Sequence, residues 1–287
     1  MIQNIGEKTL INHYAPNRAY ADSLIMIFFK RDLLLSSEDQ PKIPTRDEYF
    51  EMPLSSSRHL VFAFSIDDKD YFLSLPNIPA GEHDEPPEAP DGYEFVNMFA
   101  VTHGTGASNE MRLAVSTGVQ LNRWYINNYY CGRCGCPVVH SESERMLECP
   151  HCGNRIFPKI SPAIIAAVTD GDKLLMTRYK GRAYKERALV AGFCEIGETA
   201  EQTVAREVYE ETGIRVKNIK YVGSQPWGID DDLLLGFKAE LDGLPSIRTQ
   251  ESELSSAEWV PRGEIFEKDD DVSLTRYMIT LFKNGEL

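Results

Sequence analysis

The stretch at residues 192–214 reads GFCEIGETAEQTVAREVYEETGI, and it decides how the C-terminal half of the chain folds. Thr199 followed three residues later by Gln202 is the capping-box signature of a helix start. Gly213 supplies the left-handed residue with which helices commonly end. The spacing therefore predicts a helix from about Ala200 to Thr212, preceded by a loop that begins and ends near glycines.

Three carboxylates share one face of this predicted helix. At about 100° per residue, Glu207, Glu210 and Glu211 fall within about 100° of one another. Carboxylate oxygens are hard ligands suited to Mg²⁺ or Mn²⁺. An acidic surface helix is the competing interpretation, because like charges on a solvated face are common. Glu198 and Arg206 flank the junction of loop and helix, where we expect them to pair and brace the loop.

Four cysteines form two C-x-x-C pairs, each followed by glycine and separated by fourteen residues: Cys131, Cys134, Cys149 and Cys152. Four thiolates at this spacing predict a tetrahedral zinc site, and the glycines permit the tight turns that it needs. Such a site has no open coordination position, so we expect this zinc to be structural. Disulfides or a redox pair are the competing interpretations. Cys136 and Cys194 lie outside the pattern, and we expect neither to be a ligand.

The composition excludes several classes of protein. Of the 287 residues 42% are hydrophobic, which excludes wholesale disorder. No apolar run approaches the ~18 residues of a membrane helix, and the first residues, MIQNIGEKTL, lack an export signal. We therefore expect a cytoplasmic protein that makes no membrane contact, where disulfides are disfavoured. The formal charge of −14 argues against generic nucleic-acid binding, and a phosphorylated substrate would call for a metal.

The chain divides into three predicted domains of an α+β protein. Residues 1–126 contain strand-like runs and end in a helical stretch, which predicts an N-terminal α/β domain. Residues 127–157 hold the cysteine pairs and are expected to form the zinc ribbon. Residues 158–287 open on a continuous apolar run at 163–168, followed by a turn and a second strand.

The full pattern of residues 192–214 matches G-x5-E-x7-R-E-U-x-E-E-x-G-U, with U aliphatic, at every defined position. The chain therefore resembles the Nudix hydrolases. The resemblance implies an α/β/α sandwich for the third domain and cleavage of nucleoside diphosphates linked to another group. It further implies that Glu207, Glu210 and Glu211 bind the divalent metal, while Glu198 and Arg206 stabilise the loop–helix–loop.

A four-cysteine ribbon between an N-terminal domain and a Nudix domain resembles the NADH pyrophosphatase (NAD diphosphatase) subfamily. That subfamily carries S-Q-P-W-P-F-P-x-S after the Nudix box, whereas residues 224–232 read SQPWGIDDD, so that only the first four positions match. The resemblance makes Gln225, Trp227 and Asp232 candidate substrate-binding residues. Residues 230–232 are interpreted either as altered substrate contacts or as an acidic turn before a strand at 233–237.

Three further positions follow from the same resemblance. Glu253, six residues before Trp259, matches a further metal-binding glutamate, with Glu251 as a nearby competitor and a surface residue at a helix start as the alternative. Phe157 and Phe193 match residues that sandwich the purine, the first from the partner subunit of a homodimer. Aromatic rings on both faces of a base form a clamp, but two core phenylalanines are the alternative.

Three functions remain open at this stage. The first is hydrolysis of NAD(H) to NMN(H) and AMP, with NAD caps at RNA 5′ ends as a further substrate. The second is a Nudix hydrolase of ADP-ribose, FAD or a dinucleoside polyphosphate, suggested by the altered residues 228–232. The third is a non-catalytic nucleotide-binding regulator, against which the intact glutamates argue. For an enzyme, we expect Mg²⁺ or Mn²⁺ between the glutamates and the diphosphate, with Glu211 or Glu253 as the base.

Overall fold

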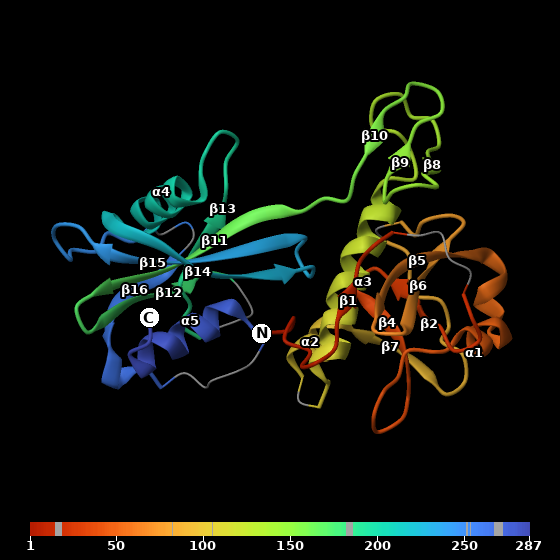
Figure 1. Ribbon diagram of the computed structural model, residues 1–287, viewed down its shortest axis with the longest axis horizontal. Coiled ribbons are helices and arrows are strands. Elements are labelled where there is room, and N and C mark those ends of the chain that lie inside the picture. The colour runs from red at the N-terminus through yellow and green to blue at the C-terminus, as the bar shows by residue number, and fades with distance from the viewer. Residues whose placement is uncertain are drawn as a thin grey trace. The chain divides into compact units, whose positions relative to one another are not determined.

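The computed structural model describes residues 1–14, 19–81, 83–104, 106–181, 186–250, 252, 254–266 and 272–287. The fold is mixed α+β, as the sequence predicts (Figure 1). Contacts divide the chain into two compact units. The C-terminal unit comprises Met1–Gln3, Ile160–Trp227 and Asp232–Leu287, and the N-terminal unit comprises Asn4–Lys159 and Gly228–Asp231.

A six-stranded sheet forms the centre of the C-terminal unit. Its strands run in the order β14-β15-β11-β12-β16, and β13 pairs with β11 beside this path. β11 is parallel to β15 and antiparallel to β12 and β13. The bounds are β11 Ser161–Asp170, β12 Lys173–Tyr179, β13 Val190–Phe193, β14 Val216–Trp227, β15 Asp232–Leu241 and β16 Leu254–Pro261.

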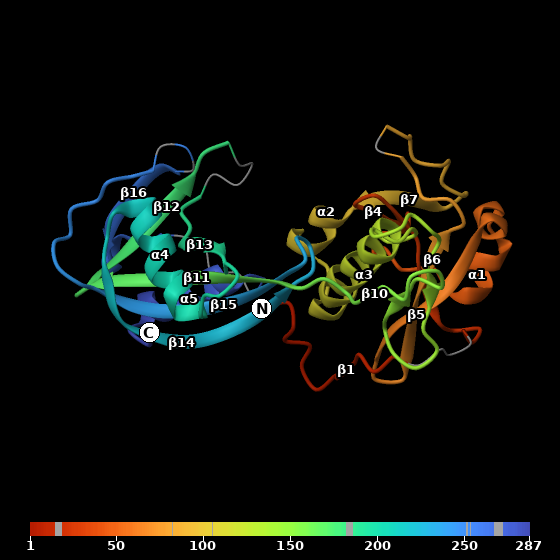
Figure 2. The same ribbon diagram turned by 90° about the horizontal axis from the view of Figure 1, so that it is seen from above.

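Two helices cover the opposite faces of this sheet (Figures 1 and 2). They are α4 (Ala200–Thr212) and α5 (Leu274–Asn284), and a 3₁₀ turn, Arg262–Glu264, follows β16. Successive side chains of a strand point to opposite faces. Alternate residues of β11 therefore enter two cores, Ile164 beneath α4 and Ile165 beneath α5. This double burial explains the continuous apolar run at 163–168 and confirms the predicted α/β/α layering.

The N-terminal unit contains two small sheets and a long helix. One sheet has the order β1-β5-β6-β2 and the other β3-β4-β7. The strand-like runs of residues 1–126 form β5 and β6 and two shorter strands, β2 and β3, which lie in different sheets; the helical stretch forms α3. The sequence did not predict β1, β4, β7, α1 and α2. The bounds are β1 Leu10–Ile11, β2 Leu24–Met26, β3 Phe28–Phe29, β4 Asp32–Ser36, β5 Arg58–Ile66, β6 Lys69–Pro76, β7 Tyr93–Asn97, α1 Arg46–Glu51, α2 Met98–His103 and α3 Asn109–Asn127, with a 3₁₀ turn at Pro53–Ser57.

Three short strands follow α3 and carry the cysteine pairs. They are β8 (Val139–His140), β9 (Leu147–Glu148) and β10 (Arg155–Ile156), in the order β10-β9-β8. Among the described helices, none is long and apolar enough to cross a membrane.

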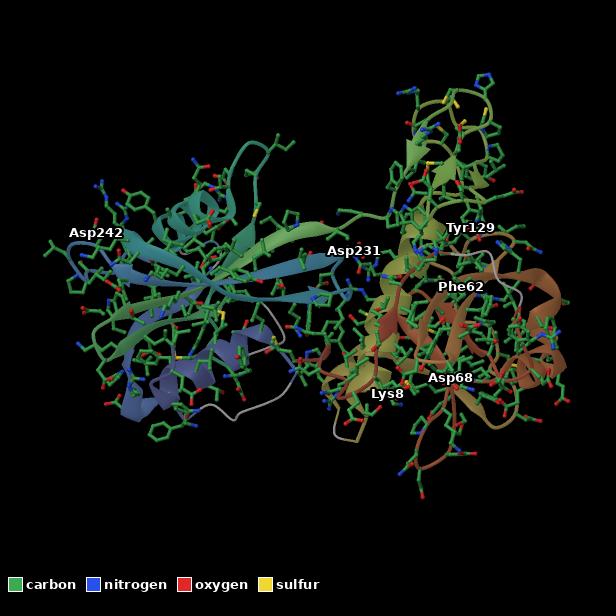
Figure 3. All side chains as sticks on the ribbon, in the orientation of Figure 1. Lys8, Phe62, Asp68, Tyr129, Asp231 and Asp242 are labelled. Atoms are coloured by element: carbon green, nitrogen blue, oxygen red, sulfur yellow. The ribbon has the colours of Figure 1, made fainter. Side chains whose placement is uncertain are left out.

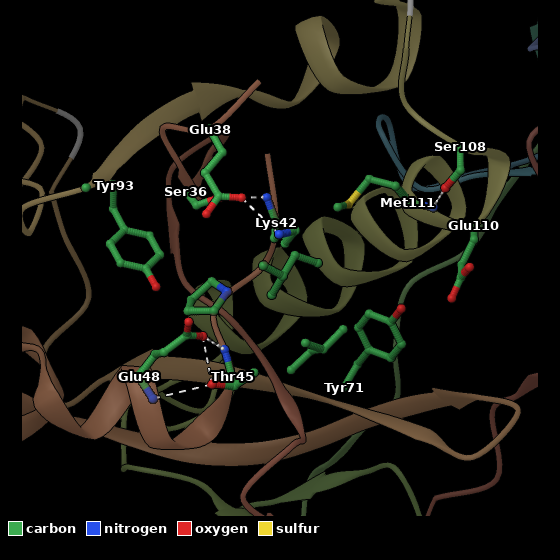
Figure 4. Close-up of a pocket in the computed structure, with 14 residues that line it drawn as sticks. Ser36, Glu38, Lys42, Thr45, Glu48, Tyr71, Tyr93, Ser108, Glu110 and Met111 are labelled. Carbon is green, nitrogen blue, oxygen red and sulfur yellow. Dashed lines mark hydrogen bonds and ion pairs between the residues drawn. The ribbon is translucent and has the colours of Figure 1, made fainter. Parts of the chain in front are cut away.

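The surface of the N-terminal unit also has an open pocket of about 560 Å³ (Figure 4). Several of its polar lining groups bond to one another. Lys42 binds Glu38 at 2.9 Å, and the Glu48 carboxylate accepts hydrogen bonds from the backbone and hydroxyl of Thr45 at 2.7 Å. The bonds between Thr45 and Glu48 stabilise the start of α1, because the two residues form the capping box of this helix. These lining groups therefore have a structural role.

Residues 228–231 form a turn that packs on α3, and Asp231 is labelled in Figure 3. Arg123 of α3 donates to Asp231 Oδ1 at 2.7 Å and to the Ile229 carbonyl oxygen at 2.8 Å. The Ile229 side chain is fully buried. The Gly228 N–H donates to Ser116 Oγ at 3.1 Å. Asp230 and Asp231 therefore belong to an acidic turn before a strand, one of the two interpretations of this segment, while Asp232 opens β15.

Gly228 approaches the backbone of α3 so closely that a Cβ atom would overlap the carbonyl oxygen of Ser116. We expect Gly228→Ala to lower the free energy of unfolding by about 1–3 kcal/mol, because a helix backbone cannot move aside as a side chain can. Gly263→Ala is the matched control, since a Cβ there has no heavy atom within 4 Å. Chemical denaturation measures both variants, and equal stabilities would contradict the packing described here.

Candidate metal and substrate site

Helix α4 begins and ends where the sequence predicts. The Thr199 hydroxyl accepts from the Gln202 N–H at 3.2 Å, and the Gln202 side chain accepts from the Thr199 N–H at 2.8 Å. Gly213 ends the helix in the left-handed conformation with φ of 70°. Val204 and Val208 are fully buried against the sheet, which fixes the rotation of the helix. The remaining faces of α4 can therefore present charged groups.

The three glutamates of α4 differ in their exposure to solvent. The Glu210 side chain is 53% exposed and that of Glu207 14%, whereas Glu211 is 1% exposed. Tyr179 at the end of β12 donates a long hydrogen bond to Glu211 Oε1, 3.4 Å away. The Gln250 N–H binds the Glu211 carbonyl oxygen at 2.9 Å. No sequence motif marked Tyr179, because strand pairing and not local spacing brings it to α4.

The Arg206 guanidinium joins the loop to the helix. Its Nε and Nη2 atoms donate to both carboxylate oxygens of Glu198, at 2.7 and 2.9 Å, so the predicted pair is present. Nη1 also donates to Glu207 at 2.7 Å and to Glu210 at 3.1 Å. Nη2 reaches the Phe193 carbonyl oxygen at 3.0 Å. One side chain thus orients two of the predicted metal ligands and the loop before them.

These contacts shift the protonation equilibria at the site. Hydrogen bonds from Arg206 lower the pKa of Glu198 to about 2, with further bonds from the Glu195 N–H and the Thr203 hydroxyl. The same bonds raise the pKa of Arg206, which stays charged. Glu198, Glu207, Glu210 and Glu211 outnumber this one guanidinium. The resulting excess of negative charge favours a bound cation.

The backbone of β13 provides a recess for Glu207. A Cβ atom on Gly192 would overlap the Glu207 carboxyl group, so only glycine lets this carboxylate lie against the strand. Three carboxylates from one helix form a hard, anionic donor set. This donor chemistry suits Mg²⁺ or Mn²⁺, although among the described residues only side chains of the zinc ribbon bring three ligand atoms within 4.8 Å of one another. The sequence motif includes Gly192, but it does not predict that Gly192 lies against Glu207.

The two candidate base-stacking residues are both exposed. Phe193 is 54% and Phe157 55% exposed, so the alternative of two core phenylalanines is wrong. Phe193 ends β13 next to Gly192, and Phe157 follows β10. Their rings are accessible to a planar ligand.

The remaining substrate candidates lie along β14 and β15. Gln225 is fully buried; its Nε2 donates to the Val272 carbonyl oxygen at 2.7 Å and its Oε1 accepts from the Leu274 N–H at 2.6 Å. Trp227 and Asp232 are register partners where β14 meets β15. Gln225 thus braces the start of α5, while Trp227 is half-buried and Asp232 is 8% exposed.

Glu253 and its competitor Glu251 lie outside the described residues. The described residues on either side are anchored near α4, since the Leu254 N–H binds the Gln250 carbonyl oxygen and Gln250 binds Glu211. A strand, β16, begins at Leu254.

The four predicted zinc ligands come together in the ribbon. The Sγ atoms of Cys131, Cys134, Cys149 and Cys152 all lie within 4.8 Å of one another. Sγ pairs are 3.5 and 3.6 Å apart, near the roughly 3.8 Å edge of a tetrahedron with Zn–S bonds of 2.3 Å. Gly135 and Gly153 turn the two knuckles with φ of 74° and 69°. All six cysteines are described and all are free thiols, so the disulfide alternative is wrong.

Two family models match separate parts of the chain. Residues 126–157 match the model of the NADH pyrophosphatase zinc ribbon domain, and residues 159–282 match the NUDIX domain. The NAD-capped RNA hydrolase NudC of Haemophilus influenzae (strain PittGG) is 41% identical over 149 residues, which cover 50% of this chain and 56% of that protein. NudC of Salmonella typhi is 44% identical over 142 residues, covering 50% and 55%.

The chain thus spans about half the length of the curated relatives it matches. A solved NUDIX hydrolase from Nitrosomonas europaea aligns over 54% of this chain and 90% of its own, with 21% identity and a TM-score of 0.42.

The recess at Gly192 generates a prediction about ion binding. We expect Gly192→Ala to keep its fold, because the overlapping carboxylate is the end of a flexible side chain. The displaced Glu207 should weaken Mn²⁺ binding on the order of ten- to a hundredfold, as loss of ligand support commonly does. Titration calorimetry measures the affinity, and Gly223→Ala, with no heavy atom within 4 Å of its Cβ, is the control. Unchanged Mn²⁺ affinity would refute the recess as a ligand support.

The Glu198–Arg206 pair generates a prediction about acid stability. The folded-state pKa of Glu198, about 2, lies below its ordinary value of 4.5, so the charged form favours folding. This contribution is complete above about pH 4.5 and is lost as the pH falls toward 2. The melting temperature of Glu198→Gln should therefore fall less steeply in this window than that of the wild type. Glu201→Gln, exposed on the first turn of α4, keeps the pair and should follow the wild type.

Proposed function

We propose that this chain, which joins an NADH pyrophosphatase zinc ribbon at residues 126–157 to a Nudix domain at residues 159–282, hydrolyses the diphosphate bond of NAD(H) to give NMN(H) and AMP. The observation that carries the proposal is the Arg206 side chain, which binds Glu207 and Glu210 on α4 and the carbonyl oxygen of Phe193, whose ring is exposed. Its relatives are NAD-capped RNA hydrolases, which supports NAD caps at RNA 5′ ends as a further substrate.

Glu207, Glu210, Glu211 and Glu253 are the proposed ligands of Mg²⁺ or Mn²⁺. When bound, such ions offset phosphate charge and acidify a water molecule. The chain's own contribution is positioning. Arg206 holds Glu207 and Glu210 at 2.7 and 3.1 Å, and the glycine at 192 leaves room for the first of them. Fixed geometry of this kind reduces the cost of bringing reactants together.

Glu211 is the proposed general base. Its carboxylate is buried, and the Tyr179 hydroxyl donates to its Oε1 atom at 3.4 Å. A general base must lie within hydrogen-bond reach of the proton that it takes, and the Tyr179 contact holds the Glu211 carboxylate in one position for that step. Glu253 is the alternative base.

Phe193 and Phe157 are the proposed clamp for the adenine ring. Arg206 ties the Phe193 carbonyl group to the metal-binding helix, so that base binding and diphosphate binding depend on one loop. Stacking of a base on an aromatic ring contributes about 1–3 kcal/mol. The ring of Phe157 would come from the partner subunit, so the proposal includes a homodimer. The proposed location is the cytoplasm, a reducing compartment in which the ribbon thiols would stay free to bind zinc.

The turn at 228–231 bears on the choice of substrate. Asp231 is paired with Arg123 at 2.7 Å, and Asp230 lies 3.6 Å from Arg31. These two carboxylates are therefore partly neutralised, and they add less repulsion toward a diphosphate than their number suggests. Trp227 and Asp232 are the proposed substrate contacts here, and Gln225 is proposed as a positioning residue.

The proposal is tested with a substrate panel. The full chain is incubated with Mn²⁺ and with NADH, NAD⁺, ADP-ribose, FAD or an NAD-capped RNA oligonucleotide, and mass spectrometry identifies the products. We expect NMN(H) and AMP from the first two substrates. Glu211→Gln should keep its zinc and its fold but lose on the order of 10²–10⁴-fold in turnover. Glu201→Gln, on the same helix, should retain activity.

Each other outcome overturns part of the proposal. Cleavage confined to ADP-ribose, FAD or a dinucleoside polyphosphate would show a Nudix hydrolase with a different substrate. Binding without cleavage would show a nucleotide-binding regulator. Near-normal turnover by Glu211→Gln would remove Glu211 as the base and leave Glu253 to be tested in the same way.

A further inference from the structure

A second group of metal-binding side chains lies beside the zinc-ribbon thiols. The Sγ atoms of Cys134 and Cys136 and a ring nitrogen of His151 all lie within 4.8 Å of one another. Cys134 belongs to both groups. The C-x-x-C pattern predicts no role for Cys136 or His151. Its only ligands are the two cysteines of each pair, and Cys136 follows the first pair while His151 lies inside the second.

The knuckle turns account for this arrangement. The Cys131 N–H donates to the Cys136 carbonyl oxygen at 2.8 Å, and Gly135 donates to Cys131 at the same distance, so the chain folds back after the first pair. His151 lies inside the second pair, between Cys149 and Cys152. Bringing the two knuckles together to form the four-thiol site therefore also brings Cys136 and His151 to one edge of it.

The distances suit a single small ion. Sulfur and imidazole nitrogen bind Zn²⁺ at about 2.0–2.3 Å, so the ligand atoms of a tetrahedral ion lie roughly 3.5–3.8 Å from one another. Three atoms within 4.8 Å therefore need only small side-chain rotations to converge. Cys134 and His151 are exposed and Cys136 is half-buried, so these rotations are open to them.

The chemistry of the neighbouring site also favours a second cation. Zn²⁺ with four thiolates has a net charge of about −2, which attracts a further positive ion. Thiolate and imidazole are ligands for Zn²⁺ and softer ions, not for Mg²⁺. A thiolate has more than one lone pair, so Cys134 Sγ can bridge two ions.

We propose that Cys134, Cys136 and His151 bind a second ion of the Zn²⁺ class, with Cys134 Sγ shared between this ion and the structural zinc. Binding releases the thiol proton of Cys136. Three protein ligands leave one coordination position open to solvent, which distinguishes this site from the closed four-thiolate site. The second ion is consequently the more weakly held and the more exchangeable of the two.

The test uses the full chain loaded with ¹¹³Cd²⁺ in place of zinc, examined by NMR and by metal analysis after gel filtration. We expect two cadmium resonances, one from the four-sulfur site and one from the mixed sulfur–nitrogen site. Cys136→Ser and His151→Ala should each lose the second resonance and bind one cadmium ion fewer per chain. Both variants should keep the resonance of the four-sulfur site. Cys194→Ser, a free cysteine of the C-terminal unit, is the matched control and should keep both.

Three results would overturn the proposal. One is a single resonance from the wild type at excess cadmium. Another is a second resonance that persists in both variants, which would place the ion elsewhere. The third is loss of both resonances in a variant that circular dichroism shows to be folded, because Cys136 or His151 would then support the structural site instead of forming a second one. The readout does not depend on hydrolase activity.

Discussion

The candidate site depends on the Arg206 guanidinium. Three glutamates, Glu198, Glu207 and Glu210, lie around the start and one face of a short helix, and their mutual repulsion would spread them apart without a central cation. Arg206 binds Glu198 through two parallel hydrogen bonds, a geometry that a lysine does not reproduce. Its remaining donor reaches Glu207 and Glu210, so that loop, helix and ligands form one hydrogen-bonded unit.

The central strand β11 gives this unit a rigid base. Its alternate side chains are buried under α4 on one face and under α5 on the other, and β13 pairs along its edge. Helix α4 packs on β11, and the Gly192–Phe193 segment pairs with the same strand. Because β11 is buried on both faces, side chains that are positioned by it are held more precisely than side chains on loops alone.

Local patterns predicted the parts of the site that depend on neighbouring residues in the chain. The capping box at Thr199, the C-terminal glycine and the two cysteine knuckles are each determined within a few residues, and all are present. Tyr179 was not predicted, because strand pairing brings it to Glu211 across 32 positions of sequence. Long-range packing likewise determines the partners of Asp231, which a sequence pattern can only describe as charged.

The bonding of Gln225 has a consequence for how signature sequences are interpreted. The Nε2 atom of its amide group donates a hydrogen bond and the Oε1 atom accepts one. Ionised aspartate and glutamate have no donor, and asparagine has a shorter side chain, so none of the three can make both bonds. Such a residue can be retained within a family because the protein needs it in order to fold, even when it lies in the middle of a motif that defines a substrate class. A diagnostic peptide therefore mixes residues selected for architecture with residues selected for recognition, and only the bonding of each side chain separates the two.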